Sequence, residues 1–330
     1  MIGYYIHHHG AGHLTRAIAV AKACTTTVTG LSSLPRPAQW DGPWIDLPMD
    51  DGDAVADVDA HERLHWVPIG SAGLADRMAA VAAWIAATRP TAFVADVSVE
   101  VSLLARLHGV PVVTMALPGL RADAAHALGF DVSAAIVAAW PEEATGTLQG
   151  LSPAAERRLH PVGAISRFAP EAGTAPPGRR VLVLAGRGGD DFTAETVAAA
   201  AAATPGWTWR HLGGTSGDWV EDPRVLLAES AVIVCAAGQS ALADVAAARR
   251  PAIVVPGKRP FDEQGTTARV LAHGDWPVIV RPALPADEEW PVLLEQAAAL
   301  DGGRWARWND GLGAERAADI VERVARGEIR

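Results

Sequence analysis

The segment Gly10-Ala-Gly-His-Leu-Thr-Arg16 combines glycines with side chains that could do acid–base chemistry beside an anion. It follows an expected strand at residues 3–6 and opens an expected helix at residues 14–23. Glycines such as Gly12 let backbone N–H groups approach a ligand, and a helix N-terminus favours negative charge. His13 could take a proton from a hydroxyl group there, or it could merely cap the turn; the strand-to-helix context favours chemistry.

Asp96 is the second candidate for chemistry. It follows an apolar run at residues 92–95 that reads as a buried strand. A parallel topology would point its side chain toward the mouth of the cleft at the carboxyl ends of the strands. Asp96 could act as a second carboxylate base, could orient His13, or could cap the helix expected at residues 99–107.

A glycine loop follows the strand expected at residues 181–185. Gly188 and Gly189 in this loop leave room for phosphates, although a glycine loop also serves as an ordinary tight turn. Asp190 and Asp191 read as N-caps of the next helix rather than as catalytic residues.

The segment from Cys235 to Gly274 carries the most specific pattern. Gly238 ends an expected strand, and Gln239 and Ser240 open a helix whose N–H groups could hold a phosphate. Asp244, further along that helix, could accept hydrogen bonds from both hydroxyls of a ribose. Gln264 opens the following helix and could bind a sugar.

Together these motifs resemble those of the GT-B glycosyltransferases, in particular the family that includes the N-acetylglucosaminyltransferase of lipid II synthesis. The resemblance covers most of the chain and implies that His13 or Asp96 deprotonates an acceptor hydroxyl. Residues 162–167 resemble an interdomain motif whose arginine approaches the donor diphosphate, and residues 219–222 resemble the segment whose backbone reads the uracil. The residues that the resemblance assigns to the nucleotide-sugar are Gly12, Arg167, Gly188, Gly189, Val220, Gly238, Gln239, Ser240, Asp244, Glu263 and Gln264.

The resemblance implies an inverting transferase that moves a hexosyl or N-acetylhexosaminyl group from a UDP-sugar to an acceptor hydroxyl, without a metal ion or other cofactor. Asp244 stands where the family usually has Glu, and Glu263 stands where the lipid II enzyme has Gln, so the sugar stays open. A nucleotide-sugar hydrolase on the same fold is the main alternative, because residues 10–16 also resemble the hydrolases of the pseudaminic acid pathway. A non-catalytic nucleotide-sugar-binding protein is the third hypothesis.

His7, His8 and His9 look at first like metal ligands. Consecutive strand residues point to opposite faces, so three neighbours could not chelate one ion comfortably, and we predict no metal site. One or two of these imidazoles should face the cleft, with His9 the better candidate. The acidic run at residues 50–53 predicts a solvated loop rather than a calcium site.

Composition narrows the class of protein further. The formal net charge is −10 and the chain has only two lysines, which argues against nucleic acid as a partner. The N-terminus predicts a cytoplasmic protein with at most peripheral membrane contact. Arginine and alanine usage fits a GC-rich, bacterial genome.

The two cysteines are expected to be buried free thiols, and most of the twelve tryptophans are expected at core or interface positions. Four tryptophans of the N-terminal half could instead line an acceptor site: Trp40, Trp44, Trp66 and Trp84.

The alternation of strands and helices predicts an α/β protein with two Rossmann-like domains that face a cleft. We expect an acceptor-side domain at residues 1–168, a proline- and glycine-rich linker at 169–178, and a nucleotide-sugar-binding domain at 179–330. The closing helix, at residues 314–326, could pack back on the first domain.

Overall fold

Two parallel β-sheets form the framework of the chain. The computed structural model describes residues 1–51, 56–172, 178–186, 192–215 and 217–330. Within these residues one sheet has seven strands, a second has five, and a small sheet pairs β6 (Gly119–Leu120) with β8 (Leu148–Gln149). Predicted linker residues 173–177 lie outside the described part of the chain.

The N-terminal sheet has the strand order β3-β2-β1-β4-β5-β7-β9, and all its described pairings are parallel. The order reverses at β1, so β1 and β4 flank the topological switch point where ligands of such sheets bind. The strands are β1 (Ile2–Ile6), β2 (Val28–Ser32), β3 (Trp44–Asp46), β4 (Ala92–Asp96), β5 (Val112–Ala116), β7 (Ala135–Ala138) and β9 (Leu159–Pro161).

Helices cover both faces of this sheet because successive strand residues alternate between the faces. Tyr4 belongs to a core that includes residues of α1 and α11, whereas Tyr5 belongs to a core that includes residues of α2 and α3. Both tyrosines are buried, which explains why the strand reads as a continuous apolar run. The helices of the chain up to the second sheet are α1 (Ala11–Ala23), α2 (Ala72–Thr88), α3 (Val99–Leu107), α4 (Ala124–Val132) and α5 (Pro153–Glu156).

The second sheet has the order β11-β10-β12-β13-β14 and is also parallel. Its order reverses between β10 and β12. The strands are β10 (Arg180–Ala185), β11 (Thr208–Gly213), β12 (Val232–Cys235), β13 (Ala252–Val254) and β14 (Val278–Val280). The helices are α6 (Ala194–Ala203), α7 (Arg224–Glu229), α8 (Gln239–Ala247), α9 (Glu263–His273), α10 (Trp290–Ala298) and α11 (Gly313–Ala325), with short 3-10 turns η1 (Pro260–Asp262), η2 (Asp287–Glu289) and η3 (Gly302–Arg307).

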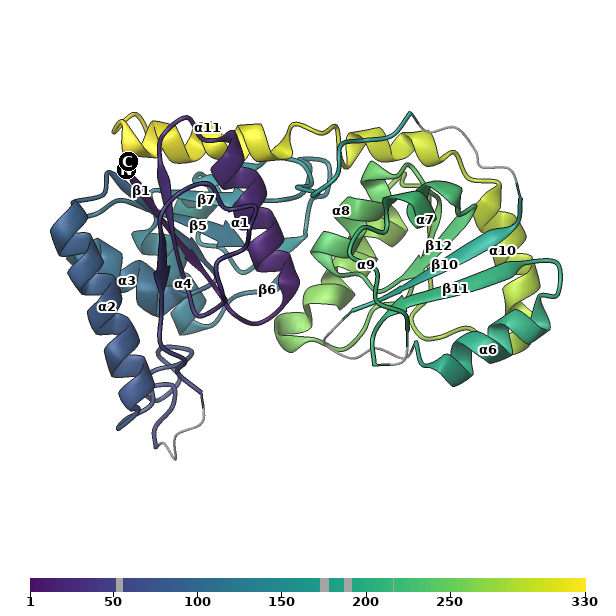
Figure 1. Cartoon of the computed structure of the whole chain (residues 1–330), viewed down its shortest axis with the longest axis horizontal. Helices are drawn as coiled ribbons and strands as arrows, with labels where there is room; N and C mark the ends of the chain where they lie inside the picture. The colour runs from purple at the N-terminus through teal and green to yellow at the C-terminus, as the bar shows by residue number, and fades with distance from the viewer. Residues whose placement is uncertain (52–55, 173–177, 187–191, 216) are drawn as a thin grey trace.

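The last helix, α11, returns from the second sheet to the first domain. It contacts α1 and strands β4, β5 and β7, and Figure 1 shows it lying along the N-terminal domain. Ala317, Val321 and Val324 bury their side chains in the core that Tyr4 shares. The expectation that the closing helix packs back on the first domain is therefore confirmed.

Tryptophans fill much of the core, as predicted. Eight of the twelve are buried, including Trp305, which is fully buried and stacks on Trp276. Cys235 is buried and Cys24 is half-buried, and both are free thiols. Among the described helices, none is long and apolar enough to cross a membrane.

Candidate active site

The switch point of the N-terminal sheet brings His13 and Asp96 together from distant parts of the sequence. Ile6 pairs with Asp96 in the β1–β4 register, so the loop that leads into α1 starts beside the carboxyl end of β4. His13 Nδ1 lies 2.9 Å from Asp96 Oδ1. Asp96 is fully buried, whereas 15% of the His13 side chain is exposed.

Arg16 completes this cluster, and sequence reasoning missed it. It lies three residues after His13 on α1, a spacing that places two side chains on the same helical face. Its Nη2 donates to Asp96 Oδ1 at 2.5 Å, and its Nε donates to Asp96 Oδ2 at 3.3 Å. Arg16 is the last residue of the Gly10–Arg16 motif, and this position is the signal by which the sequence could have identified it.

The cluster fixes which nitrogen of His13 can accept a proton. Burial alone would raise the pKa of Asp96, but Arg16 and His13 outweigh burial and hold the pKa below its ordinary value. The ionised carboxylate only accepts hydrogen bonds, so its 2.9 Å contact favours the tautomer in which His13 Nδ1 carries the hydrogen and Nε2 keeps a free lone pair, over the longer 3.3 Å contact of Nδ1 with Arg16 Nη2. Asp96 is thus placed to orient His13, and its burial leaves it no direct access to an acceptor.

The backbone beside Asp96 is strained. Val97 has φ of 65°, in the left-handed region that a β-branched residue rarely adopts. Such a conformation costs on the order of 1–3 kcal/mol and persists only where the surrounding structure enforces it. The cap of α3 is Ser98, whose side chain accepts from Val101 N, so the suggestion that Asp96 caps this helix is wrong.

A hydrogen bond from this cluster crosses to the second domain. Arg16 Nη1 donates to Gln239 Oε1 at 2.5 Å, at the start of α8. Gly12, one turn earlier on α1, lies so close to α8 that an added Cβ would clash with Ser240 Oγ. The first turns of α1 and α8, both predicted to bind the nucleotide-sugar, therefore lie against each other at the boundary between the domains.

Both of these helices begin without a side-chain cap from the described residues. Gly10 caps α1 and Gly238 caps α8, and neither can supply a capping oxygen from a side chain. The first N–H groups of each helix stay available for an anion. Gly188 and Gly189, together with Asp190 and Asp191, lie outside the described residues; the cap of α6 is Thr193.

Asp244 and Arg167, predicted to bind ribose and diphosphate, contact each other. Arg167 Nε donates to Asp244 Oδ2 at 3.1 Å, and Ser166, another residue that sequence reasoning missed, donates to Oδ1 at 2.8 Å. Burial raises the pKa of Asp244, and Arg167 opposes that rise. Arg167 keeps 42% of its side chain exposed, so it can turn toward a ligand at modest cost.

The predicted sugar-binding motif lies at the boundary between the domains. Gln264 is buried and its Oε1 accepts from Gly257 N at 2.8 Å. Glu263 Oε2 lies 3.6 Å from Arg121 Nη2 of the first domain. The same arginine lies over the ring of Phe261, with 4.6 Å to the ring centroid. Phe261 has φ of 56°, a second strained residue at this site.

Val220 is half-buried against a core cluster that both domains contribute to, in a stretch without regular structure between β11 and α7. Arg224, at the start of α7, lies over the ring of Phe168, and Arg167 lies over the same ring. The chain that follows Val220 therefore runs toward Arg167, which is predicted to bind the diphosphate.

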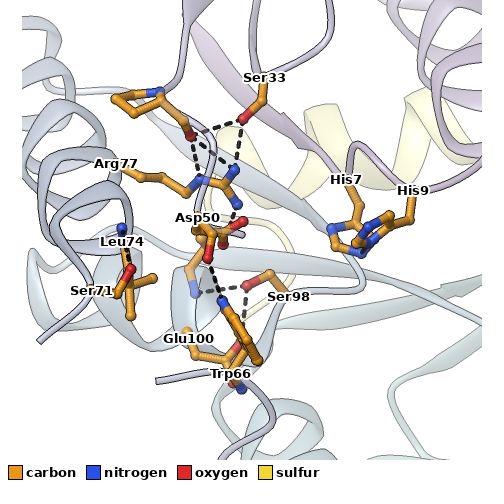
Figure 2. Close-up of polar contacts among 12 residues, drawn as sticks. His7, His9, Ser33, Asp50, Trp66, Ser71, Leu74, Arg77, Ser98 and Glu100 are labelled. Atoms are coloured by element: carbon orange, nitrogen blue, oxygen red, sulfur yellow. Dashed lines mark hydrogen bonds and ion pairs between the residues drawn. The ribbon is translucent and has the colours of Figure 1, made fainter. Parts of the chain in front are cut away.

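A cavity of about 330 Å³ opens in the N-terminal domain beside the His13 cluster. Its lining includes Trp66, Leu74 and Met78, so of the four tryptophans considered for an acceptor site only Trp66 lines this cavity. Trp40 and Trp84 are buried, as predicted for core residues. Figure 2 shows Arg77 in the wall, with Asp50 on one side and Ser33 on the other.

His7, His8 and His9 all line this cavity, and the argument that separated them is wrong. β1 ends at Ile6, so the three histidines follow the strand instead of continuing it. The chain bends there, and Gly10 has φ of 89°. The rule of alternating strand faces does not apply. Burial and the neighbouring imidazoles lower the pKa of His7 to about 3.

Comparison with known proteins supports the fold. No family model matches the chain, and no curated protein matches it. A UDP-glucosyltransferase from Polygonum tinctorium is 14% identical, with a TM-score of 0.69 and coverage of 98% of both chains. MurG of Acinetobacter baumannii is 16% identical (TM-score 0.65; 98% of this chain, 99% of that chain). The glycosyltransferase VinC, solved in complex with dTDP, is 14% identical (TM-score 0.65; 99% of both chains).

These likenesses extend over both domains. The chain has the two-domain GT-B fold, as its motifs predicted. The proteins that share this fold with it include glycosyltransferases that differ in the nucleotide named with them, UDP for one and dTDP for another.

Proposed function

We propose that the chain is a glycosyltransferase that moves a sugar from a nucleoside diphosphate donor, a UDP-sugar, to an acceptor hydroxyl with inversion. One observation carries the proposal: the Asp96–His13–Arg16 cluster joins the N-terminal domain to Gln239 on the donor-side helix. An oriented proton acceptor lies beside two uncapped helix N-termini that suit an anion.

The donor would lie at the N-termini of α1 and α8. Its diphosphate would meet the N–H groups of both helices and the guanidinium of Arg167, which stabilise the charge that develops as it leaves. This arrangement would hold the diphosphate without a metal ion. Asp244 would hold the ribose, Val220 the base, and Gln264 with Glu263 the sugar.

The acceptor would enter from the cavity of the N-terminal domain. His13 Nε2 would remove the proton of its hydroxyl while the oxygen attacks the anomeric carbon from the face opposite the diphosphate. The new glycosidic bond forms as the bond to the diphosphate oxygen breaks, and UDP leaves. Contacts between the domains would exclude water and favour transfer over hydrolysis.

The test measures UDP or dTDP release from nucleotide-sugars with and without a panel of hydroxyl compounds. A thermal-shift screen of nucleotides first selects the donor, because bound nucleotide raises Tm. Release that depends on a hydroxyl compound, with a glycoside as product, supports the proposal. Rapid release of free sugar in the absence of an acceptor would overturn it in favour of hydrolysis.

A further inference from the structure

The histidines that precede α1 form a compact cluster beside the His13–Asp96 pair, and the ring centroids of His7 and His13 lie 5.7 Å apart. The ring centroids of His8 and His9 lie 4.1 Å apart, and that of His7 lies 5.0 Å from each. One ring nitrogen from each residue lies within 4.8 Å of the other two. Figure 2 shows the imidazoles of His7 and His9 beside each other.

The nitrogen positions fit a metal ion better than they fit a hydrogen-bonded network. His9 Nδ1 lies 3.3 Å from His7 Nε2. Two ligands of a tetrahedral zinc ion, each about 2.0–2.1 Å from the metal, lie about 3.3–3.4 Å apart. His8 Nε2 is buried and has no hydrogen-bond partner among the described residues. A buried polar atom without a partner is costly, and an ion would satisfy it.

The surroundings favour a cation. Asp50, Asp51 and Glu100 line the same cavity. Arg77, the cation in that lining, is committed to Asp50, Ser33 and the Pro48 carbonyl. Its positive charge is therefore partly offset by Asp50, and Asp51 and Glu100 add negative charge to the same lining.

A second cluster, formed by His65, Asp123 and His126, already has hydrogen bonds between its side chains. Asp123 accepts from His126 Nδ1 at 2.6 Å and lies 3.1 Å from His65 Nε2. Arg121 lies 3.2 Å from His126 Nε2, where its charge would repel a cation. This cluster makes a matched control for the first.

We propose that His7, His8 and His9 bind one divalent transition-metal ion of the zinc class. Three imidazoles fill three positions of a tetrahedral site, and the fourth position faces the cavity of about 330 Å³. That position can take water or an oxygen of a molecule in the cavity. Ion binding does not depend on the proposed transferase activity.

The test uses Co²⁺ as a visible substitute for Zn²⁺, with the full chain prepared without a histidine tag and stripped with a chelator. Tetrahedral Co²⁺ absorbs in the visible range, and one equivalent should bind and be displaced by Zn²⁺. His8→Ala and His9→Ala should each weaken binding at least about tenfold. His126→Ala and the exposed His61→Ala should leave binding unchanged.

Nucleotide affinity of each variant, measured by calorimetry, separates lost ligands from misfolding, because the proposed ribose and base contacts, Asp244 and Val220, lie in the second domain. Wild-type nucleotide affinity with weakened Co²⁺ binding in His8→Ala and His9→Ala supports the site. Two results would overturn it: no stoichiometric Co²⁺ binding, or binding that survives both substitutions but is lost in His126→Ala.

Discussion

Replacing Asp96 by Asn tests the role of the buried carboxylate most directly. The substitution keeps the shape of the side chain but removes the charge that faces Arg16, whose side chain is only 6% exposed. Neutralising one partner of a buried ion pair costs about 3–5 kcal/mol. At about 2–4 °C per kcal/mol for a chain with domains of this size, Tm should fall by about 6–20 °C.

The same change should impair proton transfer. An amide can present its N–H to His13 Nδ1 and so stabilise the tautomer whose Nε2 carries the hydrogen. Loss of a positioned general base costs about 10²–10⁴-fold in rate. We therefore expect kcat to fall by that factor in Asp96→Asn, measured at a temperature where the variant is folded. Asp131→Asn, at a site with 53% side-chain exposure, is the matched control and should change Tm and kcat little.

The pH dependence supplies an independent check with a definite sign. The folded pKa of Asp96 is below its unfolded value, near 3.9. The stabilisation by the ionised carboxylate is therefore complete above about pH 4 and is lost as the pH falls through the folded pKa. The Tm difference between wild type and Asp96→Asn should narrow below about pH 4. A difference that stays constant there, or a kcat within threefold of wild type, would refute the proposed role.

Three further predictions concern the donor side. Asp244→Ala should weaken UDP binding by about 10–100-fold in calorimetry, the equivalent of about 1.5–3 kcal/mol for a charge-assisted hydrogen bond, and unchanged affinity would contradict the ribose contact. Gly12→Ala should lower kcat/KM by about 10–100-fold, because the new Cβ would clash with Ser240 Oγ and push α1 away from α8. Adding Ser240→Ala should restore the rate, because the remaining Ser240 Cβ lies 3.5 Å from the position of the new Cβ, an ordinary contact distance. Arg121→Met should raise the donor KM several-fold in steady-state assays through loss of the Glu263 and Phe261 contacts, and an unchanged KM would show that these contacts do not matter.

The sequence determined the architecture because strands and helices follow local rules. Buried parallel strands read as apolar runs, and glycine turns mark the points where each strand passes into a helix. These rules predicted two Rossmann-like domains, and the resemblance of the motifs to known glycosyltransferases implied the GT-B fold. The same rules placed His13 and Gly238 at helix N-termini, where the structure has them.

Only the tertiary structure decided how distant side chains are paired. Asp96 could have been a base, an orienting group or a cap, and its contacts with His13 and Arg16 favour orientation. The partnership of Asp244 with Ser166 spans 78 positions, and no local pattern encodes it. Such contacts between distant side chains are determined by the strand order and by how the two domains pack against each other. Both depend on packing across the whole chain.

The three histidines show most clearly the difference between what the sequence determined and what the tertiary structure decided. If the strand continued past Ile6, alternation of the strand faces would separate their rings. The strand ends at Ile6, as the sequence predicted, and in the bend that follows it the three rings lie close together. The path of the chain after the strand is beyond the reach of local propensity, because packing against the neighbouring elements decides it. The residues were visible in the sequence, but their convergence on one cavity was decided by the fold.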